Sequence, residues 1–565
     1  MQISGADIVL ESLKKLGIDT VFGYPGGVVL PLYDRFPFHP EVRHILVRHE
    51  QAGGHAADGY ARASGKLGCA LATSGPGATN LVTAIANAQM DSVPTLFITG
   101  NVARSLLGRD GFQEADITGI TTPIVKHNYL VMRVEDLAYT FAEAAFIATT
   151  GRPGPVHIDI PKDVFTDLAE FEWPEEVSIR GYQPSPRVDM TAVADAAAII
   201  DAADKPIILA GHGVILSRAH EELKAFAEKT GIPVLNTLLG LGSIPRDHAL
   251  SYGMLGMHGS YEANHAASNA DVIIGIGNRM DDRALGRFAD FNPTAKIVHI
   301  DIDAAEHGKN INTIAPLLGD AKSVLQALIP AVAQNTHTEW LRWMDDMRAE
   351  HAHSMAIPSG PGLSVQQICA SISEVNGDEV IIVTDVGQHQ MWAAQHVKFS
   401  FPYQLITSGG LGTMGFGAPA AMGAQVACPD KAVWAIVGDG GFQMTMQELA
   451  TMVDEHLPVK IAIMNNGYLG MVRQWQELFY KDNYVSVQIS QPDFVKIAEA
   501  YGILGFRVTD KDQVDDAIRR ANEHPGPVLI DFQVEAEDNV WPMVPAGASL
   551  SETVEAPRTQ QEVSR

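Results

Sequence analysis

Cysteine is scarce in this chain of 565 residues, which contains only Cys69, Cys369 and Cys428. The three lie far apart and match no spacing of metal-ligating cysteines. Disulfide-stabilised domains carry many more cysteines and occur in oxidising compartments. We therefore expect no disulfide framework, thiols that pack as small apolar groups, and a reducing cytoplasm as the location.

Positive charge is also in short supply, because 40 Lys and Arg residues face 67 Asp and Glu residues, for a net charge of −27. Binding to nucleic acid or to anionic lipid requires clustered Lys and Arg. The composition therefore argues against both kinds of partner. A small anionic substrate is still possible, since one or two local cations can dominate the field in a pocket.

Long hydrophobic runs are absent, and no uncharged apolar window reaches the ~20 residues that a transmembrane helix needs. The N-terminal stretch MQISGADIVLESLKKLG has neither the apolar core of a signal peptide nor the Arg and Ser bias of a transit peptide. We expect no membrane span and no targeting segment, which again favours the cytoplasm.

Short apolar runs alternate with helical patterns through most of the chain. Such runs are typical of strands buried on both faces, and the helices between them predict doubly wound parallel sheets of the α/β class. The predicted strands are Ala70–Ser74, Thr95–Thr99, Val156–Ile160, Ile207–Ala210, Val272–Ile276, Ile297–Ile300, Val380–Thr384, Val433–Val437, Lys460–Met464 and Val528–Phe532.

Two polar, proline-containing stretches, Thr166–Arg187 and Gln334–Gly362, have little apolar periodicity and are interpreted as linkers, the second with a polar helix-like piece. They divide the chain into three blocks and a tail: 1–165, 190–330, 365–535 and 536–565. The first and third blocks end alike, with RPGPVHIDI at Arg152–Ile160 and HPGPVLIDF at His524–Phe532. This similarity is either coincidence or a sign that the outer blocks share one topology.

The most informative motif lies in the third block. The apolar run VWAIV leads into Gly438-Asp439-Gly440-Gly441, and the next run, KIAIM, leads into Asn465-Asn466-Gly467-Tyr468. Asp439 and Asn466 should therefore both lie at the carboxyl edge of a parallel sheet, where α/β proteins bind ligands. Alone, Asp439 is a candidate helix cap and Asn-Asn-Gly a turn. Together, one carboxylate, one amide oxygen and a backbone carbonyl can bind Mg²⁺, and the glycines admit a diphosphate.

The paired motif resembles that of the thiamine-diphosphate enzymes, in which GDG precedes NN at about this separation. The resemblance implies a pyrimidine-binding first block, a diphosphate-binding third block, a middle domain, and active sites between two subunits. It also implies a glutamate in the first block, and Glu50 in the run VRHEQAGG matches it. Such a carboxylate shifts the cofactor's pyrimidine toward the form that acts as a base. Without the resemblance, Glu50 would be one solvated acid among many.

Longer strings resemble the large, catalytic subunits of acetolactate synthases over nearly the whole chain. They are Gly23–Gly27, Thr73–Asn80, Gly111–Asp116, Gly151–Val164, Met254–Gly259, Val386–Gln395, Gly409–Gly417, Gly470–Gln476 and Asn539–Gly547.

This resemblance implies roles at the matching positions. Those expected around thiamine diphosphate are Thr73, Pro76, Asn80, Gln388, His389, Met414, Gly438, Gly440, Gly441, Leu469, Gly470 and Met471. The expected Mg²⁺ ligands are Asp439, Asn466 and Tyr468. Those expected to face the reacting carbon and the second keto acid are Gly27, Phe112, Gln113, Lys162, Met257, Arg283 and Trp475. Without the resemblance, core packing and surface salt bridges would be the simpler explanations for the last four.

Biosynthetic members of this family carry FAD, and the middle block contains the matching region. The positions expected to contact FAD are Arg152, His258, Gly277, Arg279, Asp301 and Asp320. The sequence departs from the family at two places. Met280 replaces the usual Phe of the RFDDR string, and Gly441 stands where a serine is common.

The function implied is that of an acetolactate synthase, which decarboxylates pyruvate and transfers the two-carbon unit to pyruvate or 2-ketobutyrate. The alternatives are a flavin-dependent pyruvate oxidase, a flavin-free catabolic acetolactate synthase and a non-catalytic paralogue that only scaffolds a complex. The family also implies a homodimer or homotetramer and a small regulatory subunit. The tail, Asn539–Leu550 in particular, and Trp475 are candidates for the cover that keeps water from the reacting carbon.

Overall fold

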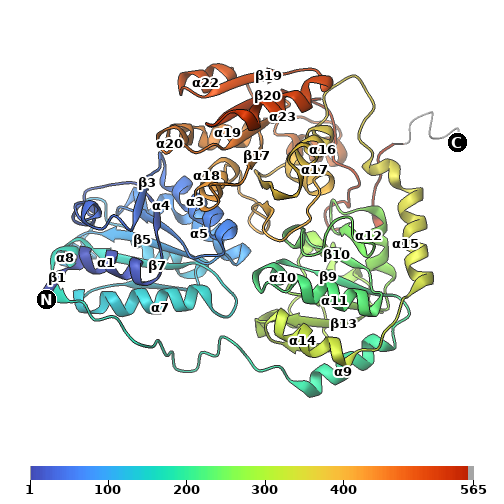
Figure 1. Ribbon diagram of the computed structural model, residues 1–565, viewed down its shortest axis with the longest axis horizontal. Coiled ribbons are helices and arrows are strands. Elements are labelled where there is room, and N and C mark those ends of the chain that lie inside the picture. The colour runs from blue at the N-terminus through green and yellow to red at the C-terminus, as the bar shows by residue number, and fades with distance from the viewer. Residues whose placement is uncertain (1, 558–565) are drawn as a thin grey trace.

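In the computed structural model, which describes residues 2–557, the chain forms three α/β blocks, each built on a six-stranded parallel sheet (Figure 1). All ten predicted strands are present, and each of them lies inside one of these sheets. Separate clusters of buried side chains cover the two faces of the sheets. The predicted doubly wound α/β class is confirmed.

The sheet of the first block has the strand order β3-β2-β4-β5-β7-β6. These strands are β2 (Thr20–Gly23), β3 (Arg43–Leu46), β4 (Gly68–Ala72), β5 (Thr95–Asn101), β6 (His127–Leu130) and β7 (Val156–Pro161). The helices are α1 (Gly5–Lys15), α2 (Leu30–Tyr33), α3 (Glu50–Ser64), α4 (Pro76–Asn80), α5 (Val82–Asp91), α6 (Ile117–Thr121), α7 (Leu137–Thr149) and α8 (Lys162–Thr166).

The third block repeats this topology, because its order β16-β15-β17-β18-β20-β19 is the same when its strands are numbered along the chain. These strands are β15 (Ile381–Thr384), β16 (Leu405–Ile406), β17 (Val433–Gly438), β18 (Lys460–Asn465), β19 (Leu504–Val508) and β20 (Val528–Gln533). The helices are α16 (Val365–Asn376), α17 (Gln388–His396), α18 (Gly417–Ala427), α19 (Asp439–Thr445), α20 (Leu449–Asp454), α21 (Gly470–Phe479), α22 (Phe494–Ala500) and α23 (Val514–Glu523). The two similar strings lead into β7 and β20, which occupy equivalent places, so their likeness reflects a shared topology.

The middle block has a different order, β11-β10-β9-β12-β13-β14, in which the chain turns back at β9. These strands are β9 (Pro206–Ala210), β10 (Val234–Asn236), β11 (Ser251–Met254), β12 (Val272–Ile276), β13 (Lys296–Asp301) and β14 (Ala315–Leu318). The helices are α9 (Met190–Asp201), α10 (His212–Leu216), α11 (His220–Thr230), α12 (Tyr261–Asn269), α13 (Asp282–Leu285) and α14 (Ala321–Ala331). The neighbouring strands β9 and β12 lie where the order reverses, and such switch points form ligand crevices.

Both expected linkers contain packed structure. After the first block, β8 (Leu168–Glu170) returns to pair with β1 (Gln2–Ser4) in an antiparallel ribbon. After the middle block, α15 (Thr338–Glu350) buries Trp340, whose indole N–H donates to the carbonyl of Pro206 at 3.0 Å. The polar piece of the second linker is therefore an integral helix of the middle block, held by buried and partly buried apolar side chains and by hydrogen bonds to Tyr252 and Ser251.

The first and third blocks share one hydrophobic core at the contact between α3 and α18. A Cβ at Gly423 would lie 1.8 Å from the carbonyl oxygen of Ala56, and one at Gly59 would lie 2.1 Å from that of Ala420. The two helices can therefore approach this closely only because both positions lack a side chain. Among the described residues, no helix is long and apolar enough to cross a membrane.

The helix contact predicts a large effect of a single methyl group. Gly423→Ala should destabilise the contact of the outer blocks by about 1–3 kcal/mol, because overpacking against a rigid backbone carbonyl forces the helices apart. Differential scanning calorimetry should show a lower unfolding temperature. Gly360→Ala is the matched control, since a Cβ there meets nothing within 4 Å. Equal unfolding temperatures for the two variants would contradict this account.

Candidate functional site

The ends of β17 and β18 bring the paired motif of the third block together. These strands are neighbours in the sheet, and Asp439 and Asn466 follow directly after them. The carboxylate of Asp439 accepts the N–H groups of Gly440 and Gly467, both at 2.8 Å, and the amide oxygen of Asn466 accepts that of Tyr468 at 3.0 Å. Burial raises the pKa of Asp439 to about 6, so it is mainly ionised at neutral pH. The pair offers hard oxygen ligands at a fixed separation.

A narrow cleft adjoins this pair. The predicted residues that line it are Gln388, His389, Met414, Gly438, Asp439, Gly440, Gly441, Asn466, Tyr468, Leu469, Gly470 and Met471. Two polar atoms in it, Oε1 of Gln388 and Nε2 of His389, are buried without a hydrogen-bond partner among the described residues. Burial lowers the pKa of His389 to about 4, so its ring is neutral. Buried polar atoms are normally satisfied, and these two fit a polar ligand.

The glycines of the motif are required by what surrounds them. A Cβ at Gly440 would lie 2.7 Å from Leu469, and one at Gly441 would lie 2.5 Å from the carboxylate of Asp385. Asp385 cannot easily move aside, because it is buried and accepts the N–H groups of Gly415 and Gly417. The absence of a serine at position 441 therefore makes room for Asp385, which holds the loop that carries Met414.

The predicted site residues of the first block gather at the carboxyl edge of its own sheet. Glu50 begins α3, is half-buried, and accepts a hydrogen bond from the side chain of Asn80 at 2.9 Å. Thr73 follows β4 and has a buried, unpartnered hydroxyl, and Pro76 begins α4. Gly27 and Phe112 lie in the loops after β2 and β5, and Phe112 is 88 % exposed.

Within one chain, this first-block group does not meet the cleft. All described residues that line the cleft come from the third block. Glu50, Thr73, Pro76 and Asn80 do not line it, and Gly27, Phe112, Gln113 and Lys162 line neither the cleft nor the larger cavity described next. Gln113 has a left-handed φ of 58° that places its backbone against Gly75.

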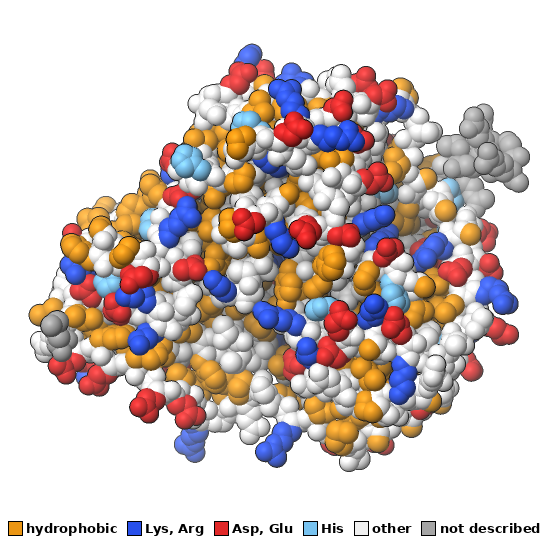
Figure 2. Space-filling model, viewed as in Figure 1, with side chains coloured by type: hydrophobic (Ala, Val, Ile, Leu, Met, Phe, Trp, Pro, Cys, Tyr) orange, Lys and Arg blue, Asp and Glu red, His pale blue; other side chains and the backbone are white. Residues whose placement is uncertain are grey.

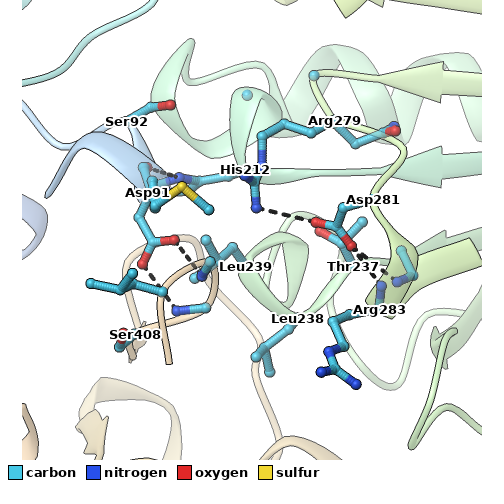
Figure 3. Close-up of a pocket in the computed structure, with 18 of the residues that line it drawn as sticks. Asp91, Ser92, His212, Thr237, Leu238, Leu239, Arg279, Asp281, Arg283 and Ser408 are labelled. Atoms are coloured by element: carbon cyan, nitrogen blue, oxygen red, sulfur yellow. Dashed lines mark hydrogen bonds and ion pairs between the residues drawn. The ribbon is translucent and has the colours of Figure 1, made fainter. Parts of the chain in front are cut away.

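A cavity of about 840 Å³ lies where the three blocks meet (Figure 3). The predicted residues that line it are Arg152, His258, Gly277, Arg279, Asp301 and Asp320, together with Met257, Arg283 and Trp475. Met414 and Met471 line both this cavity and the cleft, so the two spaces are adjacent.

The walls of the cavity contain polar and charged groups that fit a polar ligand. Gly277 has φ of 58°, and a Cβ there would lie 2.5 Å from the Cα of Gly213, so two backbone segments meet closely. Nδ1 of His258 is buried and unpartnered, and burial lowers the pKa of His258 to about 4. Arg152 pairs with Glu306 at 2.6 Å, and burial raises the pKa of Asp301 to about 6.

The substitution at position 280 also has a local explanation. Met280 is buried with φ of 49°, and the position of a Cβ at Gly275 would be only 2.3 Å from its Cε. The flexible thioether therefore fills the space above the glycine.

Sequence reasoning missed a group of polar residues in this wall. Asp91 accepts the N–H groups of Gly409 at 3.0 Å and Gly410 at 2.7 Å, and its carbonyl bonds the ring of His212 (Figure 3). It also pairs with the buried Arg62. These contacts join all three blocks, and no local motif marks Asp91, because its partners are distant in the sequence.

Arg283, Met257 and Trp475 converge at one end of the cavity. The guanidinium of Arg283 donates to the sulfur of Met257 at 3.3 Å and lies 6.0 Å from the centre of the Trp475 ring. The tail packs over this end, since the N–H of Val544 donates to the carbonyl of Met257 at 2.7 Å. Arg473 holds the start of the tail through the carbonyl of Glu537.

Comparisons with known proteins give a consistent result. Residues 3–120, 193–328 and 385–532 match the N-terminal TPP binding domain, the central domain and the C-terminal TPP binding domain of the thiamine pyrophosphate enzymes.

The chain is 48% identical over 564 residues to the acetolactate synthase large subunit of Mycobacterium tuberculosis, a match that covers 98% of this chain and 91% of that protein. It is 48% identical to the large subunit of Corynebacterium glutamicum, covering 98% and 90%, and 44% identical to a probable large subunit of Methanocaldococcus jannaschii, covering 100% and 97%. The chain belongs to the acetolactate synthase large-subunit family of thiamine pyrophosphate enzymes.

Proposed function

We propose that the chain is the catalytic subunit of an acetolactate synthase, which decarboxylates pyruvate and joins the remaining two carbons to pyruvate or 2-ketobutyrate. The observation that carries this proposal is the meeting of two spaces. One is the cleft with Asp439, Asn466 and the unpartnered Gln388 and His389, and the other is the cavity with Arg283.

Thiamine diphosphate and Mg²⁺ fit the cleft. Asp439, Asn466 and the carbonyl of Tyr468 would hold the cation, and the glycines would admit the diphosphate. When bound, the cofactor supplies the electron sink that lets pyruvate lose carbon dioxide and then add to a second keto acid. Gln388 and His389 would orient it, and Glu50 would hold a proton at its pyrimidine ring.

The 840 Å³ cavity fits FAD, and the unpartnered Nδ1 of His258 and the close backbone approach at Gly277 support that ligand. Arg152, Arg279, Asp301 and Asp320 would bind it. Met280 packs against Gly275, and Arg279, Asp281 and Arg283 beside it line the cavity.

A second copy of the chain would complete the site, giving a homodimer or homotetramer. The cleft lacks Glu50 and its neighbours within one chain, and these residues lie at an edge that also exposes Tyr24, Leu30 and Phe112. The third block likewise exposes two large apolar side chains, those of Met444 and Tyr480. An exposed apolar group of this kind on each side suits burial between protomers.

Arg283 would bind the carboxylate of the second keto acid, a task suited to a guanidinium. Trp475 would shape the pocket for its alkyl group, and Gly27, Gln113 and Lys162 would face the reacting carbon from the other protomer. The tail would exclude water. Acidic and basic side chains are interspersed on the face shown in Figure 2. From the family resemblance, we place the protein in the cytoplasm with a small regulatory subunit as partner.

Omission of each cofactor tests the reaction. Protein stripped of cofactors should form acetolactate from pyruvate only when thiamine diphosphate and Mg²⁺ are restored, and it should need FAD for full activity. The purified protein should show a flavin absorption spectrum. Acetate or peroxide as the main product would instead indicate a pyruvate oxidase, and activity without flavin would indicate the catabolic enzyme.

Glu50→Gln should lower the rate of acetolactate formation about 100-fold or more, because a positioned acid–base group contributes about 10²–10⁴ in rate. Circular dichroism should show an intact fold. Glu135→Gln is the control, since Glu135 is an exposed acid of the same block. Full activity of Glu50→Gln would overturn the assignment.

Trp475→Leu should reduce the preference for 2-ketobutyrate over pyruvate in a competition assay. The change should be bounded, because one methylene is worth only ~1–3 kcal/mol of discrimination. Trp343→Leu is the control. Trp343 lies on α15 and lines neither the cleft nor the cavity, so this variant should leave the product ratio unchanged. An unaltered ratio in Trp475→Leu would remove this residue from the specificity pocket.

A further inference from the structure

Glu448 is a buried carboxylate that the proposed reaction does not use. It lies at the end of the short 3₁₀ turn Met446–Glu448, which follows α19, and its exposed fraction is 0 %. Both of its oxygens accept the backbone N–H of Arg48, at 3.0 and 3.1 Å. Arg48 belongs to the first block and lies two residues before Glu50.

The segment that leads to Glu50 is held to its own block through Val47, whose N–H donates to the carbonyl of Gly23 at 3.2 Å and whose side chain is buried. It follows β3, which is an edge strand that pairs only with β2. The third block supplies further contacts. The hydroxyl of Thr451 lies 3.1 Å from the carbonyl of Leu46 and 3.0 Å from an oxygen of Glu448, to either of which it can donate, and Arg43 and Arg48 form ion pairs with Glu455 and Asp454.

Among these contacts, the one from Glu448 is the strongest candidate for fixing the backbone. The two ion pairs involve partly exposed side chains, and such pairs contribute little. A buried carboxylate bonded to a backbone N–H is a charge-assisted contact in a region of low dielectric, and its loss leaves a buried donor unpaired. Burial raises the pKa of Glu448 to about 7, so the contact is fully charge-assisted only above neutral pH.

We infer that Glu448 is a positioning residue for Glu50, which holds the Arg48 backbone and thereby the start of α3, where Glu50 stands. The inference rests on the proposed role of Glu50. The local geometry supports it. His49 lies between Arg48 and Glu50, and it caps α3 because its ring accepts the N–H of Gln51 at 3.2 Å. A shift of the Arg48 backbone would therefore move Glu50 relative to the cofactor.

The rate at which the C2 proton of bound thiamine diphosphate exchanges with deuterium tests the inference, because that rate reports the action of Glu50. Glu448→Ala should lower it about tenfold or more, since small misplacements of catalytic groups are costly. The affinity for thiamine diphosphate with Mg²⁺, measured by fluorescence titration, should be unchanged. Arg48→Ala is the control, because it removes the ion pair with Asp454 and keeps the backbone N–H. Exchange as slow in this variant as in Glu448→Ala would contradict a role for the hydrogen bonds between Glu448 and the Arg48 backbone.

Two conservative variants separate positioning from charge and also serve if Glu448→Ala does not fold. Glu448→Gln keeps an oxygen that can accept the Arg48 N–H, so it should exchange at nearly the wild-type rate. Glu448→Asp keeps the charge and withdraws the oxygens by one methylene, so it should exchange slowly. The opposite ranking would show that Glu448 acts through its charge and would overturn the inference.

A double variant distinguishes this inference from the proposed function. Glu50→Gln combined with Glu448→Ala should exchange no more slowly than Glu50→Gln alone, because residues that act through one another are non-additive. Independent, multiplied losses would overturn the positioning role. Wild-type exchange in Glu50→Gln itself would refute the proposed function, whereas slow exchange there with wild-type exchange in Glu448→Ala would refute only the role of Glu448.

Discussion

The close contact of α3 with α18 is the constraint on which the arrangement of the outer blocks depends. Gly59 and Gly423 let each helix approach the backbone carbonyls of the other, and the side chains around them form one core that belongs to both blocks. α3 begins at Glu50 and α18 follows the loop that carries Met414. The contact between the two helices therefore helps to fix the positions of Glu50 and of this loop. Rigid elements hold functional groups more accurately than free loops do.

The strands at the centre of each sheet could be predicted from sequence, because burial on both faces requires unbroken apolar runs such as VIIGI and VWAIV. Edge strands lack that requirement. β6 reads HNYL with every side chain partly or fully exposed, and β16 has only two residues, so neither has a clear pattern. The sequence of α15 resembles a linker for the same reason, since its helical face buries only Trp340 and Met344.

Some residues of the candidate site could be predicted from the sequence, and others could not. Asp439 and Asn466 could be predicted to meet because strand ends of a parallel sheet share an edge, and that rule needs only local sequence. Asp91 and Glu448 could not, because each works through backbone groups of residues more than 300 positions away. Backbone N–H groups have no sequence signature, so a carboxylate that binds them looks like any other acid. Glu50 does not line the cleft of its own chain, so no rule that works within one chain could relate the two.

The position of Glu448 connects the packing within one chain to the active site that the proposed dimer would form with the other. The stretch from Asp439 to Glu448 begins at a proposed cation ligand and ends at the residue that binds the backbone of Arg48, two residues before the same chain's Glu50. If Glu50 serves the cleft of the partner, this single stretch contributes to two active sites at once. The buried hydrogen bonds of Glu448 then explain why a block that binds one cofactor must also pack firmly against the first block of its own chain, since a loose α3–α18 contact would misplace the acid of the other site.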